Sequence, residues 1–190
     1  MLDPNSFYGR LSKIRGGDSA ELIDVVKKSV VQLLTTSTDA RKPGMLLGKI
    51  VSGKTRGFLG IIADGFDKGF DIAIVLTKGT KALSGQTVAR FKKDFAEFID
   101  EDAVALFDIM QMPPRLSVPE RNRKLIFIAK KQKQNLERIQ KLFTDYSHVA
   151  AVPAGRHQRA RLVRPPLLVA GSDRPAGRYT LHLRCGIEGR

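Results

Sequence analysis

Cysteine and long apolar runs are scarce in this chain, and each shortage excludes a class of protein. The lone Cys185 cannot form an internal disulfide, which excludes a disulfide-stapled fold and favours a reducing compartment such as the cytoplasm. No run approaches the roughly 18 apolar residues that a membrane-spanning helix needs, and residues 1–15 lack the apolar core of a signal peptide. We therefore expect a cytoplasmic protein with no membrane segment.

Acidic residues are also few, with 19 Asp and Glu against 33 Lys and Arg, which leaves a net charge of +14. Such an excess indicates a polyanionic partner, either nucleic acid or an anionic surface. The three histidines, His148, His157 and His182, have no metal-ligand spacing, and one cysteine cannot complete a zinc site with them. We therefore expect a nucleic-acid partner and no zinc centre.

Residues 48–55 match the phosphate-loop pattern GxxxxGK(S/T) in full. Gly48 and Gly53 permit a backbone that turns successive N–H groups around an anion, and the following helix adds its positive N-terminal dipole. Lys54 is expected to reach the β- and γ-phosphates of ATP, and the Thr55 hydroxyl to ligate Mg²⁺. The neighbouring Ser52 and Arg56 complete the predicted nucleotide-binding set.

Apolar spacing alternates between helix and strand periods on both sides of this loop. The pattern predicts helices over 18–35, over 54–67 with Gly69 as its stop, over 81–99 and over 131–143. It predicts strands at 45–47, 71–77 and 125–129, a capping box at 117–120 and an ambiguous apolar segment at 103–110. This order predicts an α/β fold with a doubly wound, mainly parallel sheet over 43–145, preceded by a helical lead-in over 1–42.

The composition changes beyond residue 145. Residues 146–190 contain eight Arg, no Lys and only two acidic residues, and Pro, Gly and Ala are frequent there. Three explanations are open: a shifted reading frame in a GC-rich gene, a basic arm that binds nucleic acid, or an ordinary final hairpin. We favour the first, and expect an irregular Arg-rich tail.

The segment Gly79-Thr-Lys-Ala-Leu-Ser-Gly-Gln86, which follows the second predicted strand, resembles the PTRELAxQ element of superfamily-two helicases. Thr80, Leu83 and Gln86 are in register, whereas Gly79 and Ala82 replace the usual Pro and Glu. With the phosphate loop, it makes 45–143 similar to the first RecA-like lobe of DEAD/DEAH-type ATPases, including those of restriction and phage-defence systems.

The resemblance implies an ATP- and Mg²⁺-binding lobe of a nucleic-acid-dependent ATPase, with DNA as the expected nucleic acid and defence-system proteins as candidate partners. It assigns Thr80 and Lys81 to contacts with the nucleic-acid backbone. Lys78, in the same predicted loop, is expected to join them, since exposed lysines position phosphates without reading bases.

The acidic strand that this family uses for hydrolysis is not recognisable. The motif is an apolar strand ending in Asp-Glu, and the nearest candidate, Asp108, is followed by Ile109. An ordinary turn or cap residue is the alternative for Asp108. Because the family also uses a second lobe, we do not expect efficient hydrolysis by this chain alone. Two other functions stay open: a small phosphotransferase with Arg121 and Arg123 in a lid, and a nucleic-acid-binding protein with a regulatory nucleotide site.

Overall fold

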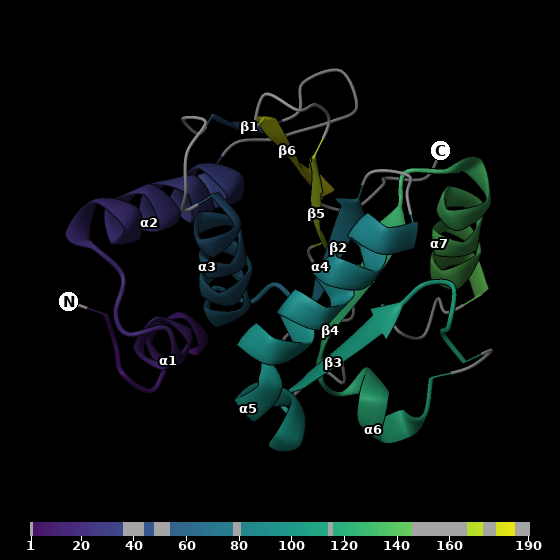
Figure 1. Ribbon diagram of the computed structural model, residues 1–190, viewed down its shortest axis with the longest axis horizontal. Helices are drawn as coiled ribbons and strands as arrows, with labels where there is room; N and C mark the ends of the chain where they lie inside the picture. The colour runs from purple at the N-terminus through teal and green to yellow at the C-terminus, as the bar shows by residue number, and fades with distance from the viewer. Residues whose placement is uncertain are drawn as a thin grey trace, which may run out of the picture.

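A computed structural model describes residues 2–35, 44–47, 54–77, 81–113, 116–145, 167–172 and 178–184. These form a mixed α/β fold in which helices flank a sheet of mainly parallel strands (Figure 1). The helices are α1 (Phe7–Ile14), α2 (Ala20–Thr35), α3 (Lys54–Asp67), α4 (Lys81–Asp94), α5 (Ala96–Asp100), α6 (Val118–Arg121) and α7 (Lys133–Asp145). The strands are β1 (Gly44–Leu47), β2 (Ile72–Thr77), β3 (Val104–Asp108), β4 (Lys124–Lys130), β5 (Leu167–Ser172) and β6 (Arg178–Arg184).

The described strands lie in the order β1-β6-β5-β2-β4-β3. β2 pairs in parallel with β4 and β5, and β3 pairs in parallel with β4. β6 is antiparallel to both of its neighbours, β1 and β5. It follows that β1 runs in the same direction as β5, β2, β4 and β3, so these five strands end at the same edge of the sheet.

Alternate residues of β2 and β4 face two separate hydrophobic clusters. Ala73 and Val75 of β2, with Ile126 and Ile128 of β4, belong to a cluster that also contains buried side chains of α1 to α5. The opposite face supplies Ile72, Ile74, Leu125, Phe127 and Ala129 to a second cluster with Ile139 and Leu142 of α7. Two-sided burial explains why both strands are continuous apolar runs.

Most elements predicted from apolar spacing are confirmed. α2, α3, β1, β2, β4 and α7 lie where they were expected, Gly69 adopts a φ of 93° after α3, and Ser117 and Glu120 form the predicted capping box of α6. The ambiguous segment 103–110 contains β3.

Two expectations need correction. The single helix expected over 81–99 is divided into α4 and α5 at Phe95, whose φ of −105° and ψ of 15° depart from helical values. Phe91, Phe95 and Phe98 are all buried, so the two helices meet within the aromatic part of the core. The irregular tail expected over 146–190 includes regular structure, because β5 and β6 pair there as antiparallel strands of the sheet. This arrangement corresponds to the alternative of a final hairpin.

The N-terminal helices are attached to α3 by polar contacts and close packing. The Asp67 carboxylate, at the end of α3, accepts hydrogen bonds from the backbone N–H groups of Phe7 (2.8 Å) and Tyr8 (3.0 Å) and so satisfies free donors in the first turn of α1. Lys27 of α2 forms an ion pair with the buried Asp64 of α3 at 2.9 Å. Both contacts depend on acidic residues of α3.

Gly60 lies in α3 where the three helices meet. A Cβ atom at this position would lie 3.0 Å from Tyr8 Cε2 and 3.0 Å from Val26 Cγ2, both in buried side chains. Glycine therefore allows α1 and α2 to approach α3 closely.

Within the residues that the structure describes, no helix has the length and apolar character needed to cross a membrane.

We expect Gly60→Val to lower the free energy of unfolding by about 1–3 kcal/mol, because the added methyl groups overpack the junction of the three helices. The matched control is Gly85→Val in α4, where a Cβ atom meets nothing within 4 Å. That surface change is expected to stay within about 0.5 kcal/mol of the wild type. Urea denaturation of both variants tests the difference, and equal effects would contradict the packing described here.

Candidate functional site

The predicted phosphate loop lies between β1 and α3. β1 ends at Leu47 and α3 begins at Lys54, while Gly48, Ser52 and Gly53 fall outside the described residues. For Lys54 the backbone is described as the first residue of the helix. The first turn of a helix has N–H groups without intrahelical acceptors and carries partial positive charge, which favours an anion. The motif thus stands between a strand that ends at Leu47 and a helix that begins at Lys54.

Thr55 and Arg56 occupy the first turn of α3, and both are half-buried. The Arg56 Nε–H donates to the Asp18 carboxylate, and its Nη2 donates to the backbone carbonyls of Arg15 (3.0 Å) and Gly17. The Arg56 guanidinium, which was predicted to bind nucleotide, is therefore engaged with the connection between α1 and α2.

Asp18 anchors this connection. Its side chain is fully buried, and its backbone N–H donates to Ser12 Oγ at 2.9 Å. Arg15, at the end of α1, pairs with Asp94 of α4 at 3.4 Å and also donates to the Arg56 carbonyl at 3.2 Å. The result is a charged network that joins the α1–α2 connection to the start of α3 and the end of α4. Motif reasoning missed Asp18 and Arg15 because no local spacing links them to Arg56.

The second predicted contact segment follows β2. Lys78 and Thr80 fall outside the described residues, and Lys81 is the first residue of α4. β2 ends at Thr77, whose hydroxyl donates to the Ala129 carbonyl at 3.3 Å, while the Lys131 N–H donates to the Thr77 carbonyl at 2.9 Å. The end of β2 therefore lies beside the basic end of β4.

Asp108 is the last residue of β3, a strand at the end of the sheet order. Its Oδ1 accepts a hydrogen bond from the Met110 backbone N–H at 2.9 Å, which is the behaviour of a turn-capping residue. This contact favours the cap interpretation over a metal-binding role.

β5 adds a residue that the sequence reasoning missed. This strand, Leu167–Ser172, begins with four apolar residues and pairs in parallel with β2, and Asp173 follows it in the sequence. The signal was a short apolar run, Leu167 to Ala170, with an aspartate three residues beyond it. It was overlooked because the surrounding composition suggested an irregular tail.

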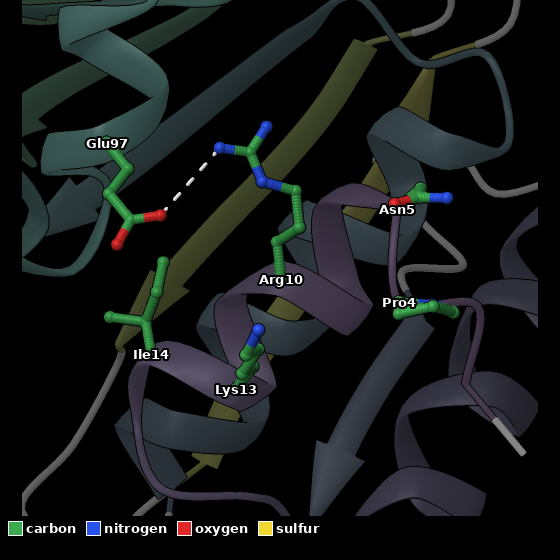
Figure 2. Close-up of a pocket in the computed structure, with 6 residues that line it drawn as sticks. All are labelled: Pro4, Asn5, Arg10, Lys13, Ile14 and Glu97. Atoms are coloured by element: carbon green, nitrogen blue, oxygen red, sulfur yellow. Dashed lines mark ion pairs between the residues drawn. The ribbon is translucent and has the colours of Figure 1, made fainter.

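A surface hollow lies beside α1 and α5, lined by Pro4, Asn5, Arg10, Lys13, Ile14 and Glu97 (Figure 2). Arg10 forms two hydrogen bonds with Glu101, at 2.8 and 2.7 Å, and an ion pair with Glu97 at 3.7 Å, while its guanidinium lies 4.6 Å from the centre of the Phe98 ring. The hydrogen bonds from Arg10 lower the pKa of Glu101. None of the predicted site residues lines this hollow.

Comparison of the chain with protein-family models, with curated proteins and with solved structures found no significant match.

Tyr8 of α1 is fully buried beside the charged network. Its hydroxyl and the Oδ2 atom of Asp18 have no hydrogen-bond partner in the part of the chain that the structure describes. Burial raises the pKa of Tyr8, and the negative charges of Asp18 and Asp64 raise it further. The folded protein therefore keeps this phenol neutral at a pH where an unfolded tyrosine ionises.

We predict that Tyr8 makes stability fall at high pH. In the unfolded chain the phenol loses its proton near pH 10, whereas the folded state retains it, so above about pH 10 ionisation stabilises only the unfolded state. The free energy of unfolding of the wild type should fall relative to that of Tyr8→Phe as the pH rises above this value. Urea denaturation of both proteins from about pH 8 to 11 measures the difference. A difference independent of pH would refute the assignment.

Proposed function

We propose that this chain contains the ATP-binding lobe of a helicase-like, nucleic-acid-dependent ATPase. The observation that carries the proposal is that the GxxxxGKT segment connects β1 to α3, with the helix beginning at the motif lysine, Lys54. The direction of β1 supports it as well, because β1 ends at the edge of the sheet where β2, β3, β4 and β5 also end. Ligands of open α/β sheets bind at this edge.

The donor set of this segment fits a nucleotide phosphate and its metal ion. Backbone N–H groups of a glycine-containing loop and of a helix start, an ammonium group and a hydroxyl are the groups that hold Mg·ATP. In this proposal the backbone from Gly48 to Gly53 surrounds the phosphates, Lys54 neutralises their charge and the Thr55 hydroxyl is a ligand of Mg²⁺. The ion supplies charge neutralisation and orients the phosphate oxygens.

Lys78, Thr80 and Lys81 are proposed to contact the nucleic-acid backbone. Support comes from the register of the sheet, in which Thr77 of β2 is paired with Lys130 of β4. β2, which precedes the Lys78 to Lys81 segment in the sequence, and β4, which ends at Lys130, are therefore neighbouring strands that end at one edge. A row of cations there suits a phosphodiester backbone, with single-stranded DNA as the first candidate.

Hydrolysis requires an acidic residue that helps to hold the magnesium ion. In the family that the sequence resembles, the acidic strand follows the helix that corresponds to α7, and β5 is the next described strand after α7. We propose Asp173, which follows β5, for this role in place of Asp108. Arg174 stands where the water-orienting Glu is expected, so turnover by this chain is proposed to be slow. A cytoplasmic location and partners from defence systems belong to the same proposal.

Mg·ATP is expected to bind the wild-type chain, and Lys54→Ala is expected to abolish binding because it removes the cation that neutralises the phosphates. Lys68→Ala is the matched control, since this exposed lysine follows the opposite end of the same helix. Isothermal titration calorimetry with ATP measures both variants. An unchanged dissociation constant for Lys54→Ala would refute the assignment. Phosphate transfer to a panel of nucleosides, without stimulation by single-stranded DNA, would instead favour a phosphotransferase.

Single-stranded DNA is expected to bind more weakly when Lys78 or Lys81 is replaced by Ala. Each variant should lower affinity about equally for all base sequences, and should reduce the slope of log affinity against log salt by about one. Lys92→Ala, a change of the same charge near the end of α4, is the control and should have a smaller effect. Fluorescence anisotropy between about 50 and 200 mM salt gives the slopes. Affinity that hardly depends on salt would contradict a phosphate-contact surface.

A further inference from the structure

The first turn of α3 is tied to the N-terminal helices by the side chain of Arg56. This guanidinium contacts the Asp18 carboxylate and the carbonyls of Arg15 and Gly17, which all lie in the connection between α1 and α2. In return, Arg15 donates to the Arg56 carbonyl, so the backbone of the turn is held as well as the side chain. The contacts therefore run in both directions across the same junction.

Asp18 provides a rigid anchor for this contact. Its side chain is fully buried, and its backbone is fixed by the hydrogen bond to Ser12. A buried carboxylate needs a charged partner, and the Arg56 guanidinium supplies one through a charge-assisted hydrogen bond. Movement of the α1–α2 connection would thus either displace the first turn of α3 or leave a buried charge without its partner.

A second ion pair connects the N-terminal helices to α3 at a position farther along α3. Lys27 of α2 pairs with the buried Asp64 of α3. Asp64 lies eight residues beyond Arg56, which is about 12 Å along the helix axis. Disrupting the Lys27–Asp64 pair tests the attachment of α2 to α3 in general. Disrupting the Arg56–Asp18 pair tests a local effect at the start of α3.

We infer that Arg56 is a positioning residue, which through Asp18 fixes the first turn of α3, where Lys54 and Thr55 lie. In this inference the N-terminal helices support the nucleotide site by holding the first turn of α3, and they make no direct contact with the ligand. The effect on ATP affinity rests on the proposed function, whereas the effect on the helix start does not.

Asp18 distinguishes this role from direct binding. A carboxylate near a phosphate site repels the anion, so removing its charge would strengthen ATP binding if only long-range electrostatics mattered. If Asp18 acts by holding Arg56, neutralising Asp18 instead weakens ATP binding. The sign of the change therefore identifies the mechanism.

The test compares Asp18→Asn, Arg56→Gln and the double variant with Lys27→Gln, which breaks the second ion pair. Hydrogen exchange of a peptide covering residues 54–61 is measured without nucleotide, and ATP affinity is measured by calorimetry. We expect Asp18→Asn and Arg56→Gln each to speed exchange in this peptide and to weaken ATP binding by about tenfold, with little further loss in the double variant. Lys27→Gln should lower the melting temperature but leave ATP affinity within about twofold of the wild type.

Other outcomes would overturn the inference. Unchanged hydrogen exchange over residues 54–61 in both Asp18→Asn and Arg56→Gln would contradict it. Weaker ATP binding in Arg56→Gln but not in Asp18→Asn would also contradict it, because that result would indicate direct contact between Arg56 and the ligand. If either variant fails to fold, Arg56→Lys and Asp18→Glu preserve the charges but alter the contact, and the same readouts apply. If the wild type binds no ATP, the proposed function fails, and hydrogen exchange still decides whether Arg56 and Asp18 fix the start of α3.

Discussion

Burial of β2 and β4 on both faces is the constraint on which the rest of this fold depends. Their alternate side chains enter two hydrophobic clusters, so helices must cover both sides of the sheet. At roughly 25 cal/mol per Å² of apolar surface removed from water, covering both faces is a dominant contribution to stability. Helices cover both faces, and β1, β2 and β4 all end at the carboxyl edge of the sheet. In the sequence, these strand ends come just before the Gly48 to Thr55 motif, the Lys78 to Lys81 segment and Lys131.

Charged side chains then determine how the N-terminal helices attach to this α/β core. α3 presents Arg56 in its first turn, the buried Asp64 farther along and Asp67 at its end, and each contacts a different part of α1, α2 or the connection between them. The carboxylates of Asp18 and Asp64 are buried, and a buried charge is costly unless it is paired, so the contacts with Arg56 and Lys27 offset that cost. The start of α3 is thereby in contact with residues nearly forty positions earlier in the chain.

Local patterns predicted much of the fold because they need no distant partner. The apolar runs of β2 and β4, the spacing of α3 and the Ser117 capping box each depend on neighbouring residues alone. The division between α4 and α5 at Phe95 was not predicted, because the apolar spacing of Phe91, Phe95 and Phe98 continues across it without a break. β5 and β6 were also missed, because arginine and proline around them hid short strands that pair with partners far away in sequence.

The same division applies to the candidate site. The sequence alone determined the phosphate-loop motif, the residues Lys54 and Thr55 within it and the excess of positive charge, because a motif and a net charge are properties of residue order and composition. Only the tertiary structure decided that Arg56 lies against Asp18, that Asp108 caps a turn and that β5 joins β2. These facts depend on contacts between residues that are distant in the chain or on the conformation of a turn, and neither is encoded in local spacing.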